Sequence, residues 1–135
     1  MRKFATKVVL MTAAALIVVG VAAGATYRGI EPITIAGNPT CSNVPGLTFT
    51  SQVKFAAPIN GASAGGVYLF VDGNTVGWYT LGGAPLIKAV IVKGGPSANV
   101  YKYPAFDDFS DGSLLPPLNP KNGNVYTLGS VTFCY

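Results

Sequence analysis

The chain has 135 residues, of which 50% are hydrophobic and only 10% are charged, and it contains no histidine. This composition supplies enough apolar area for a folded core and excludes a disordered chain. Without histidine, a Ser-His-Asp triad and a Cys-His dyad are excluded, and a zinc site would need unusual ligands.

A cation-led apolar segment opens the chain. Arg2, Lys3 and Lys7 precede an uncharged stretch over residues 8–25, which ends in an A-x-A pattern at Ala23 and Ala25. This arrangement predicts an export signal peptide over residues 1–25. The stretch is only just long enough to span a membrane, so a retained anchor is the alternative. After cleavage we expect an extracellular or cell-surface protein with no membrane attachment.

The charge after the leader is nearly balanced. Three of the nine basic residues lie in the leader, so six basic and five acidic residues follow it, and the lysines among them are scattered singly. Surfaces that follow nucleic-acid phosphates need clustered cations, so we expect no nucleic-acid partner. Residues 26–135 are enough for one domain.

Two cysteines, Cys41 and Cys134, bracket nearly all of the chain after the leader. In an exported protein, two such cysteines are expected to pair as a disulfide. The bond would close a loop of about 93 residues, which the loop-entropy model values at roughly 4–5 kcal/mol.

The segment before the first cysteine, residues 26–40, is expected to be an extended arm. It carries Ile30, Ile33 and Ile35, and residues 33–35 alternate apolar and polar as a short strand does. Two interpretations stay open. The segment is a lead-in or edge strand of its own domain, or these isoleucines contact a neighbouring subunit to which the strand is donated.

The pattern after the first cysteine is that of strands. Alternation predicts a half-buried strand over residues 47–55, and a Gly- and Ala-rich loop follows it. Strands over residues 67–71 and 76–81 flank Asp72 and Gly73, which are typical of a hairpin turn. The continuous apolar run over residues 86–92 predicts a central strand buried on both faces.

The C-terminal part continues the pattern. Residues 99–103 return as a strand, residues 105–124 are expected to be irregular, and residues 125–134 form the last strand with a bulge or bend at Gly129. No helical periodicity appears. We therefore predict an all-β fold over residues 41–135, an antiparallel β-sandwich of about six to seven strands with one disulfide.

One acidic cluster, Asp107, Asp108 and Asp111, is the candidate for metal chemistry. Calcium takes several oxygen ligands, so a weak calcium site is one hypothesis. The spacing matches no strong calcium motif, and a solvated turn is the alternative. A glycosidase would need a buried acid with a raised pKa, which this loop does not indicate. We expect no enzyme activity and no other cofactor.

Aromatic residues are the candidates for binding. Trp78, Tyr101 and Tyr103 would contact a glycan if they formed an exposed row, and alternation places Tyr101 and Tyr103 on one face of their strand. The alternative is core or cross-strand packing, which is common for aromatic residues in strands.

Three segments carry a resemblance to a known group. Residues 87–95 (IKAVIVKGG), 98–104 (ANVYKYP) and 131–135 (VTFCY) resemble a group of uncharacterised bacterial extracellular β-domains. The group has a histidine before its last strand, where this chain has Gly129 and Ser130, and a TGLHAP-like stretch, where this chain has residues 112–116. The resemblance implies a secreted or surface-displayed β-domain and brings no catalytic activity with it.

Together these features predict a secreted, non-catalytic structural subunit of the cell surface or of an extracellular fibre, assembled by strand donation from residues 26–40. Low charge, an extended arm and the lack of a catalytic set support it. The alternative is an extracellular module that binds glycan or another surface component. The expected partners are further copies of the chain or a surface polymer.

Overall fold

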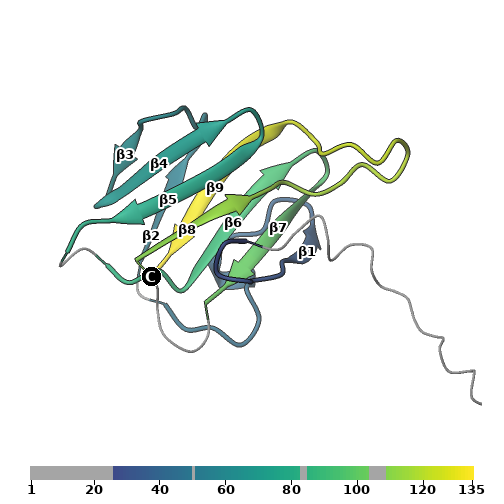
Figure 1. Cartoon of the computed structure of the whole chain (residues 1–135). Helices are drawn as coiled ribbons and strands as arrows, with labels where there is room; N and C mark the ends of the chain where they lie inside the picture. Colours follow the sequence, from purple (N-terminus) through teal and green to yellow (C-terminus); the bar gives the residue numbers. More distant parts are fainter. Residues whose placement is uncertain (1–25, 50, 83–84, 104–108) are drawn as a thin grey trace, which may run out of the picture.

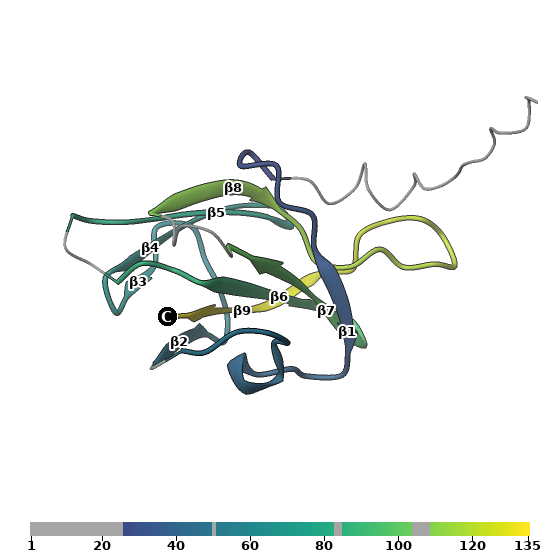
Figure 2. The same cartoon turned by 90° about the horizontal axis from the view of Figure 1, so that it is seen from below.

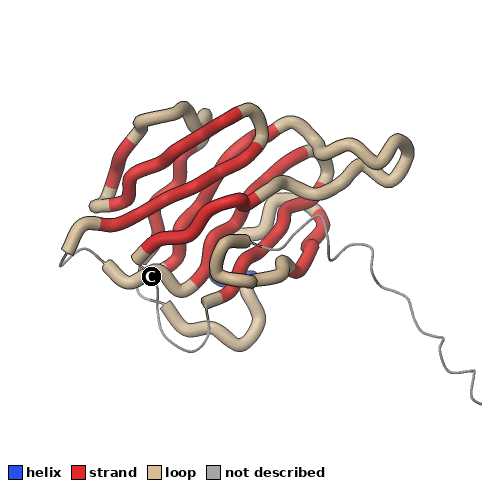
Figure 3. Tube along the Cα trace, viewed as in Figure 1, coloured by secondary structure: helices blue, strands red, loops and turns tan. Residues whose placement is uncertain are grey.

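The computed structural model describes residues 26–49, 51–82, 85–103 and 109–135, so the predicted signal peptide lies outside the described part. The described chain forms two antiparallel sheets that pack face to face (Figures 1 and 3). The all-β sandwich is thereby confirmed, with nine strands where about six to seven were expected. The strands are β1 (Ile33–Ala36), β2 (Gln52–Phe55), β3 (Ser63–Ala64), β4 (Val67–Asp72), β5 (Thr75–Thr80), β6 (Ala89–Gly94), β7 (Ser97–Lys102), β8 (Ser110–Leu114) and β9 (Leu128–Cys134).

The first sheet has the order β1-β7-β6-β9-β2, with β6 at its centre. Val90 and Val92 face the space between the sheets, whereas Ala89 and Ile91 face outward and are equally buried. The predicted central strand with two buried faces is therefore confirmed. In β9, Gly129 is the extra residue of a bulge, because Ser130 lies opposite Lys93 while Leu128 lies opposite Gly94.

Residues 41–49 cover the outer face of this first sheet (Figure 2). They begin with a short 3₁₀ helix, η3 (Cys41–Asn43), and bring Val44, Leu47 and Phe49 against the outward side chains. The Nζ atoms of Lys88 and Lys102 donate to backbone oxygens of this segment, at Thr48 and Pro45. The predicted strand over residues 47–55 is accordingly shorter and begins only at β2.

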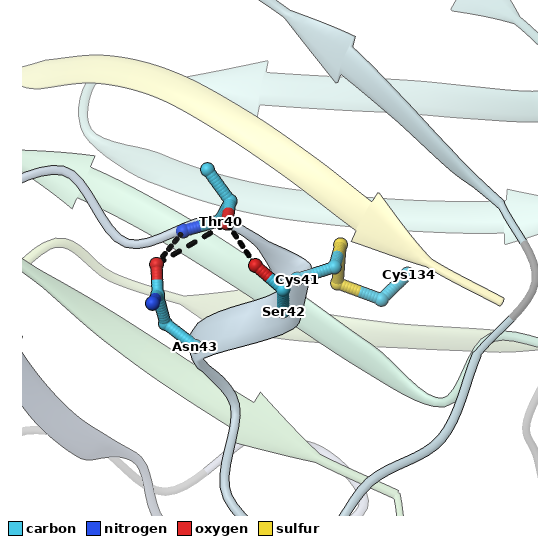
Figure 4. The surroundings of a disulfide bond; sticks show 5 residues. All are labelled: Thr40, Cys41, Ser42, Asn43 and Cys134. Carbon is cyan, nitrogen blue, oxygen red and sulfur yellow. Dashed lines mark hydrogen bonds between the residues drawn. A yellow bond between two sulfur atoms is a disulfide. The ribbon is translucent and has the colours of Figure 1, made fainter.

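Cys41 and Cys134 form the expected disulfide, which ties the covering segment to the last strand (Figure 4). Thr40 organises the turn around it, because its backbone N–H donates to Asn43 Oδ1 at 2.8 Å and its hydroxyl contacts Ser42 Oγ at 2.8 Å. A disulfide is typical of proteins that fold outside the reducing cytoplasm. Among the described residues, no helix has the length and hydropathy needed to cross a membrane.

The second sheet has the order β3-β4-β5-β8. The predicted hairpin is confirmed, with Asp72 paired to Thr75 and Gly73 in the left-handed region at φ +63°. Strand β8 lies in the stretch that was expected to be irregular. Its sequence, Ser-Asp-Gly-Ser-Leu, lacks apolar alternation, and its register against β5 shifts between Val76 and Trp78.

The core between the sheets is centred on Trp78. Its indole ring meets the rings of Tyr103 and Phe133 edge to face, with centroids 5.6 Å away in each pair. Val67, Leu69, Val76 and Leu114 complete the contribution of the second sheet.

The N-terminal segment belongs to the sandwich. Strand β1 pairs antiparallel with β7 of its own chain, with Ile33 opposite Val100. Ile30 and Ile35 pack against the two core clusters, while Ile33 remains 43% exposed. Of the two interpretations of this segment, the structure shows the edge strand of its own domain, and the sandwich extends before Cys41.

Candidate binding groove

The three aromatic residues proposed as glycan contacts do not form an exposed row. Trp78, Tyr101 and Tyr103 are 1%, 0% and 2% exposed, so no ring face is open to a sugar. The assignment of these residues to a binding surface is therefore wrong, and the core interpretation is correct. The hydroxyls of Tyr101 and Tyr103 bind Leu115 and Asp111 within the fold.

Asp111, the one described member of the acidic cluster, is an interior residue. Its Oδ2 accepts from the Tyr103 hydroxyl at 2.7 Å, and its Oδ1 accepts from the backbone N–H groups of Arg28 and Gly112 at 3.0 and 2.8 Å. Asp107 and Asp108 lie outside the described residues. Within the described ranges, no group of three or more possible metal ligands of the His, Cys, Asp and Glu types occurs. The calcium hypothesis stays a prediction.

A different set of aromatic residues lies on the outer face of the second sheet. Tyr68 and Phe70 alternate along β4 with buried Val67 and Leu69, so their side chains point away from the core. Tyr79 of β5 stacks on both, with ring centroids 5.0 Å from Tyr68 and 5.5 Å from Phe70. Phe70 is 54% exposed.

Beside this stack the surface is hollowed because two glycines replace side chains. Gly77 lies opposite Phe70 on the neighbouring strand, and the Cα of Gly112 on β8 would be 3.8 Å from a Cβ placed at Gly77. The resulting groove has a volume of about 720 Å³, within the range of ligand-binding clefts. Its lining consists of Tyr27, Asn60, Phe70, Val71, Asp72, Thr75, Gly77, Trp78, Tyr79, Ser110, Asp111, Gly112 and Ser113.

Tyr27 borders the groove on the side opposite Phe70. Its ring lies directly on the backbone of Gly112, so closely that a Cβ at Gly112 would be 2.7 Å from two ring carbons. The side chain is 85% exposed. Gly77 and Gly112, here called the glycine floor, are thus bordered by the aromatic stack of β4 and β5 on one side and by Tyr27 on the other.

Among the residues that the structure describes, the polar lining combines hydroxyl, amide and carboxylate groups and includes no lysine or arginine. Asp72 and Thr75 lie where the hairpin turns, and Ser110 and Ser113 lie on β8. Ser113 has φ +64°, a left-handed conformation that is uncommon outside glycine and that recurs at binding sites. The groove therefore offers apolar ring surface together with hydroxyl and amide groups. Both carboxylate oxygens of Asp111 already accept hydrogen bonds from within the fold.

Sequence reasoning missed Tyr27, Phe70, Gly77 and Gly112. For Phe70 and Gly77 the signal was present in the predicted hairpin. Once Asp72 and Gly73 fix the turn, Tyr68, Phe70 and Gly77 fall on the face opposite Trp78, and that face carries the polar and small residues. The contribution of Tyr27 had no such signal, because its contact with Gly112 spans most of the chain.

Comparisons of the chain with protein-family models, with curated proteins and with solved structures found no match.

Proposed function

We propose that the protein is an exported, non-catalytic module that binds a neutral glycan in the groove on the outer face of the second sheet. The observation that carries this proposal is the aromatic stack of exposed Phe70 with half-buried Tyr68 and Tyr79, which lies beside the glycine floor. Sugar rings present apolar C–H faces together with hydroxyl groups, and they are bound by aromatic surfaces flanked by hydrogen-bonding side chains.

The contrast between the two sheets supports the proposal. The outer face of the first sheet is covered by residues 41–49, so its apolar side chains are part of the core. On the outer face of the second sheet, Phe70 keeps more than half of its surface exposed although it belongs to a well-paired strand. A contiguous apolar patch that the fold leaves uncovered is typical of a binding surface.

The composition of the lining favours a neutral ligand over an acidic one. It holds two carboxylates, Asp72 and Asp111, whereas the neighbouring guanidinium of Arg28 is engaged with Ser110 O and Oγ. Asp111 is engaged in structural hydrogen bonds through both oxygens, which supports binding without catalysis. The disulfide and the resemblance to bacterial extracellular domains support a location outside the cell.

The proposal is tested by measuring binding to neutral hexasaccharides of glucose, xylose, mannose and N-acetylglucosamine by calorimetry. Phe70→Ala removes one ring of the stack and should weaken binding about tenfold. Gly77→Val should abolish binding without loss of stability, because the added side chain fills the groove, a Cβ there meets only ordinary contacts, and valine favours strands.

Phe109→Ala is the matched control, because Phe109 is 51% exposed, close to the 54% of Phe70, and does not line the groove. It should bind as the unchanged protein does. If none of the oligosaccharides binds, or if Gly77→Val binds as well as the unchanged protein, the proposed function is wrong.

The second candidate is a structural subunit that self-associates through its N-terminal strand. The observation that favours it is that residues 26–36 contact the edge strand β8 of one sheet and pair through β1 with β7 of the other, and a second copy has the same two strands. Exchange of this strand between copies would build a dimer or a fibre. Sedimentation of the exported protein tests it. A concentration-dependent assembly that is lost on deleting residues 26–36 is expected, and a monomer at all concentrations contradicts it.

A further inference from the structure

Residues 26–30, here called the docking segment, contribute more to the groove than one side chain. The segment folds as a compact loop in which Thr26 Oγ1 accepts from the backbone N–H groups of Arg28 and Ile30, each at 3.2 Å. Gly29 closes the loop with φ +75°. These internal bonds give the segment a defined shape although it forms no strand.

The docking segment is held on the edge of β8 by hydrogen bonds to three of its residues. The Tyr27 backbone N–H donates to Gly112 O at 3.1 Å, the Arg28 backbone N–H donates to Asp111 Oδ1 at 3.0 Å, and Arg28 Nε donates to Ser110 O at 3.0 Å. All three acceptors belong to groove-lining residues. The position of the Tyr27 ring over the floor therefore depends on this docking.

We infer that the docking segment forms one wall of the glycan site, so that glycan binding and docking of the segment on β8 stabilise each other. This inference rests on the proposed function. A glycan that contacts both Phe70 and Tyr27 binds more tightly when the segment is docked. By thermodynamic linkage, the bound glycan then favours the docked state by the same factor.

The first test measures affinity for whichever hexasaccharide binds the unchanged protein most tightly. Tyr27→Ala should weaken binding about tenfold, as expected for the loss of one stacking ring, and Tyr27→Trp should restore it. Gly112→Ala should weaken binding as well, because the new Cβ displaces the Tyr27 ring. If that displacement is the cause, Gly112→Ala should add little to Tyr27→Ala in the double variant.

The second test measures hydrogen exchange at the backbone amides of Tyr27 and Arg28, which donate to β8 and so report docking. Saturating hexasaccharide should slow their exchange about tenfold, matching the affinity ratio from the first test. The amide of Val44, which donates to Cys41 O in the segment that covers the other sheet, is the control and should not change.

The outcomes separate this inference from the proposed function. If Phe70→Ala loses binding while Tyr27→Ala binds normally and the two amides exchange at an unchanged rate, the linkage is wrong and the groove remains the glycan site. If the unchanged protein binds no hexasaccharide, both are wrong. Weakening by Tyr27→Ala together with slower amide exchange on saturation supports the linkage.

Discussion

Individual polar side chains connect the two sheets through the interior. The Tyr101 hydroxyl of β7 donates to Leu115 O and accepts from Leu115 N–H, both at 2.9 Å, at the end of β8. Asn99 also donates to Leu115 O and accepts from the Thr34 hydroxyl of β1. Tyr101 and Asn99 thus supply hydrogen-bond partners to the backbone of Leu115, where the chain leaves the second sheet. Polar side chains are tolerated in the core because they are hydrogen-bonded there.

Tyr101→Phe should lower the free energy of unfolding by about 1–3 kcal/mol at neutral pH, because the Leu115 N–H loses its partner in a partly buried position. Burial raises the pKa of Tyr101 above its ordinary value of 10.0, and the charge of Asp111 adds to this, while hydrogen bonds with Leu115 and Asn99 oppose it. The neutral hydroxyl therefore stabilises the fold fully below about pH 10, and its contribution is lost as the pH rises through the folded pKa.

The difference in unfolding free energy between the unchanged protein and Tyr101→Phe should accordingly narrow above about pH 10. Denaturant titrations at several pH values measure it. Tyr68→Phe, on the outer face, serves as the control for general alkaline effects. A difference that stays constant into strongly alkaline solution would contradict the prediction.

At the residue scale, the sequence predicted the disulfide but not the binding residues. Only one pairing of Cys41 and Cys134 is possible, so the prediction needed no geometry. Trp78 and Tyr79 are adjacent in sequence, and alternation alone does not say which of them faces the core. That choice depends on the strands paired with β5, and therefore on contacts distant in sequence.

At the element scale, strands with a strong local signal were found and those without one were missed. The β4–β5 hairpin and β6 were predicted because a turn dipeptide and a continuous apolar run mark them. Strand β8 was missed because its pairing with β5 depends on a bulge and on Ser113 in a left-handed conformation. The sequence did not predict that β1 pairs with β7 of its own chain. A short edge strand carries little information about whether its partner strand belongs to the same chain or to another copy.

The covering segment, residues 41–49, is the element that the disulfide holds in place. Replacing Cys41 and Cys134 together by alanine should lower the free energy of unfolding by about 4 kcal/mol, because a loop of this length gains conformational freedom in the unfolded chain. Thermal or denaturant unfolding measures the loss, and reductant should have no further effect on the variant. A loss below about 1 kcal/mol would show that packing against Ile91 and Val100 holds the segment unaided.

At the scale of the whole molecule, the two sheets differ in what covers them. The first sheet is enclosed between the core and the covering segment, whereas the second is open over Phe70, Tyr79 and the glycine floor. The sequence predicts a sandwich but not which outer face stays open, because that depends on where residues 26–49 lie across both sheets. The proposed function follows from this asymmetry.

The most direct measurement of that claim is a titration of the isotope-labelled protein with its tightest-binding neutral hexasaccharide, followed by backbone amide NMR spectra. We expect chemical-shift changes concentrated at Tyr27, Phe70, Gly77 and Gly112, with no change at Ile91 on the covered face. Spectra that do not change with any oligosaccharide, or changes centred on the first sheet, would contradict it.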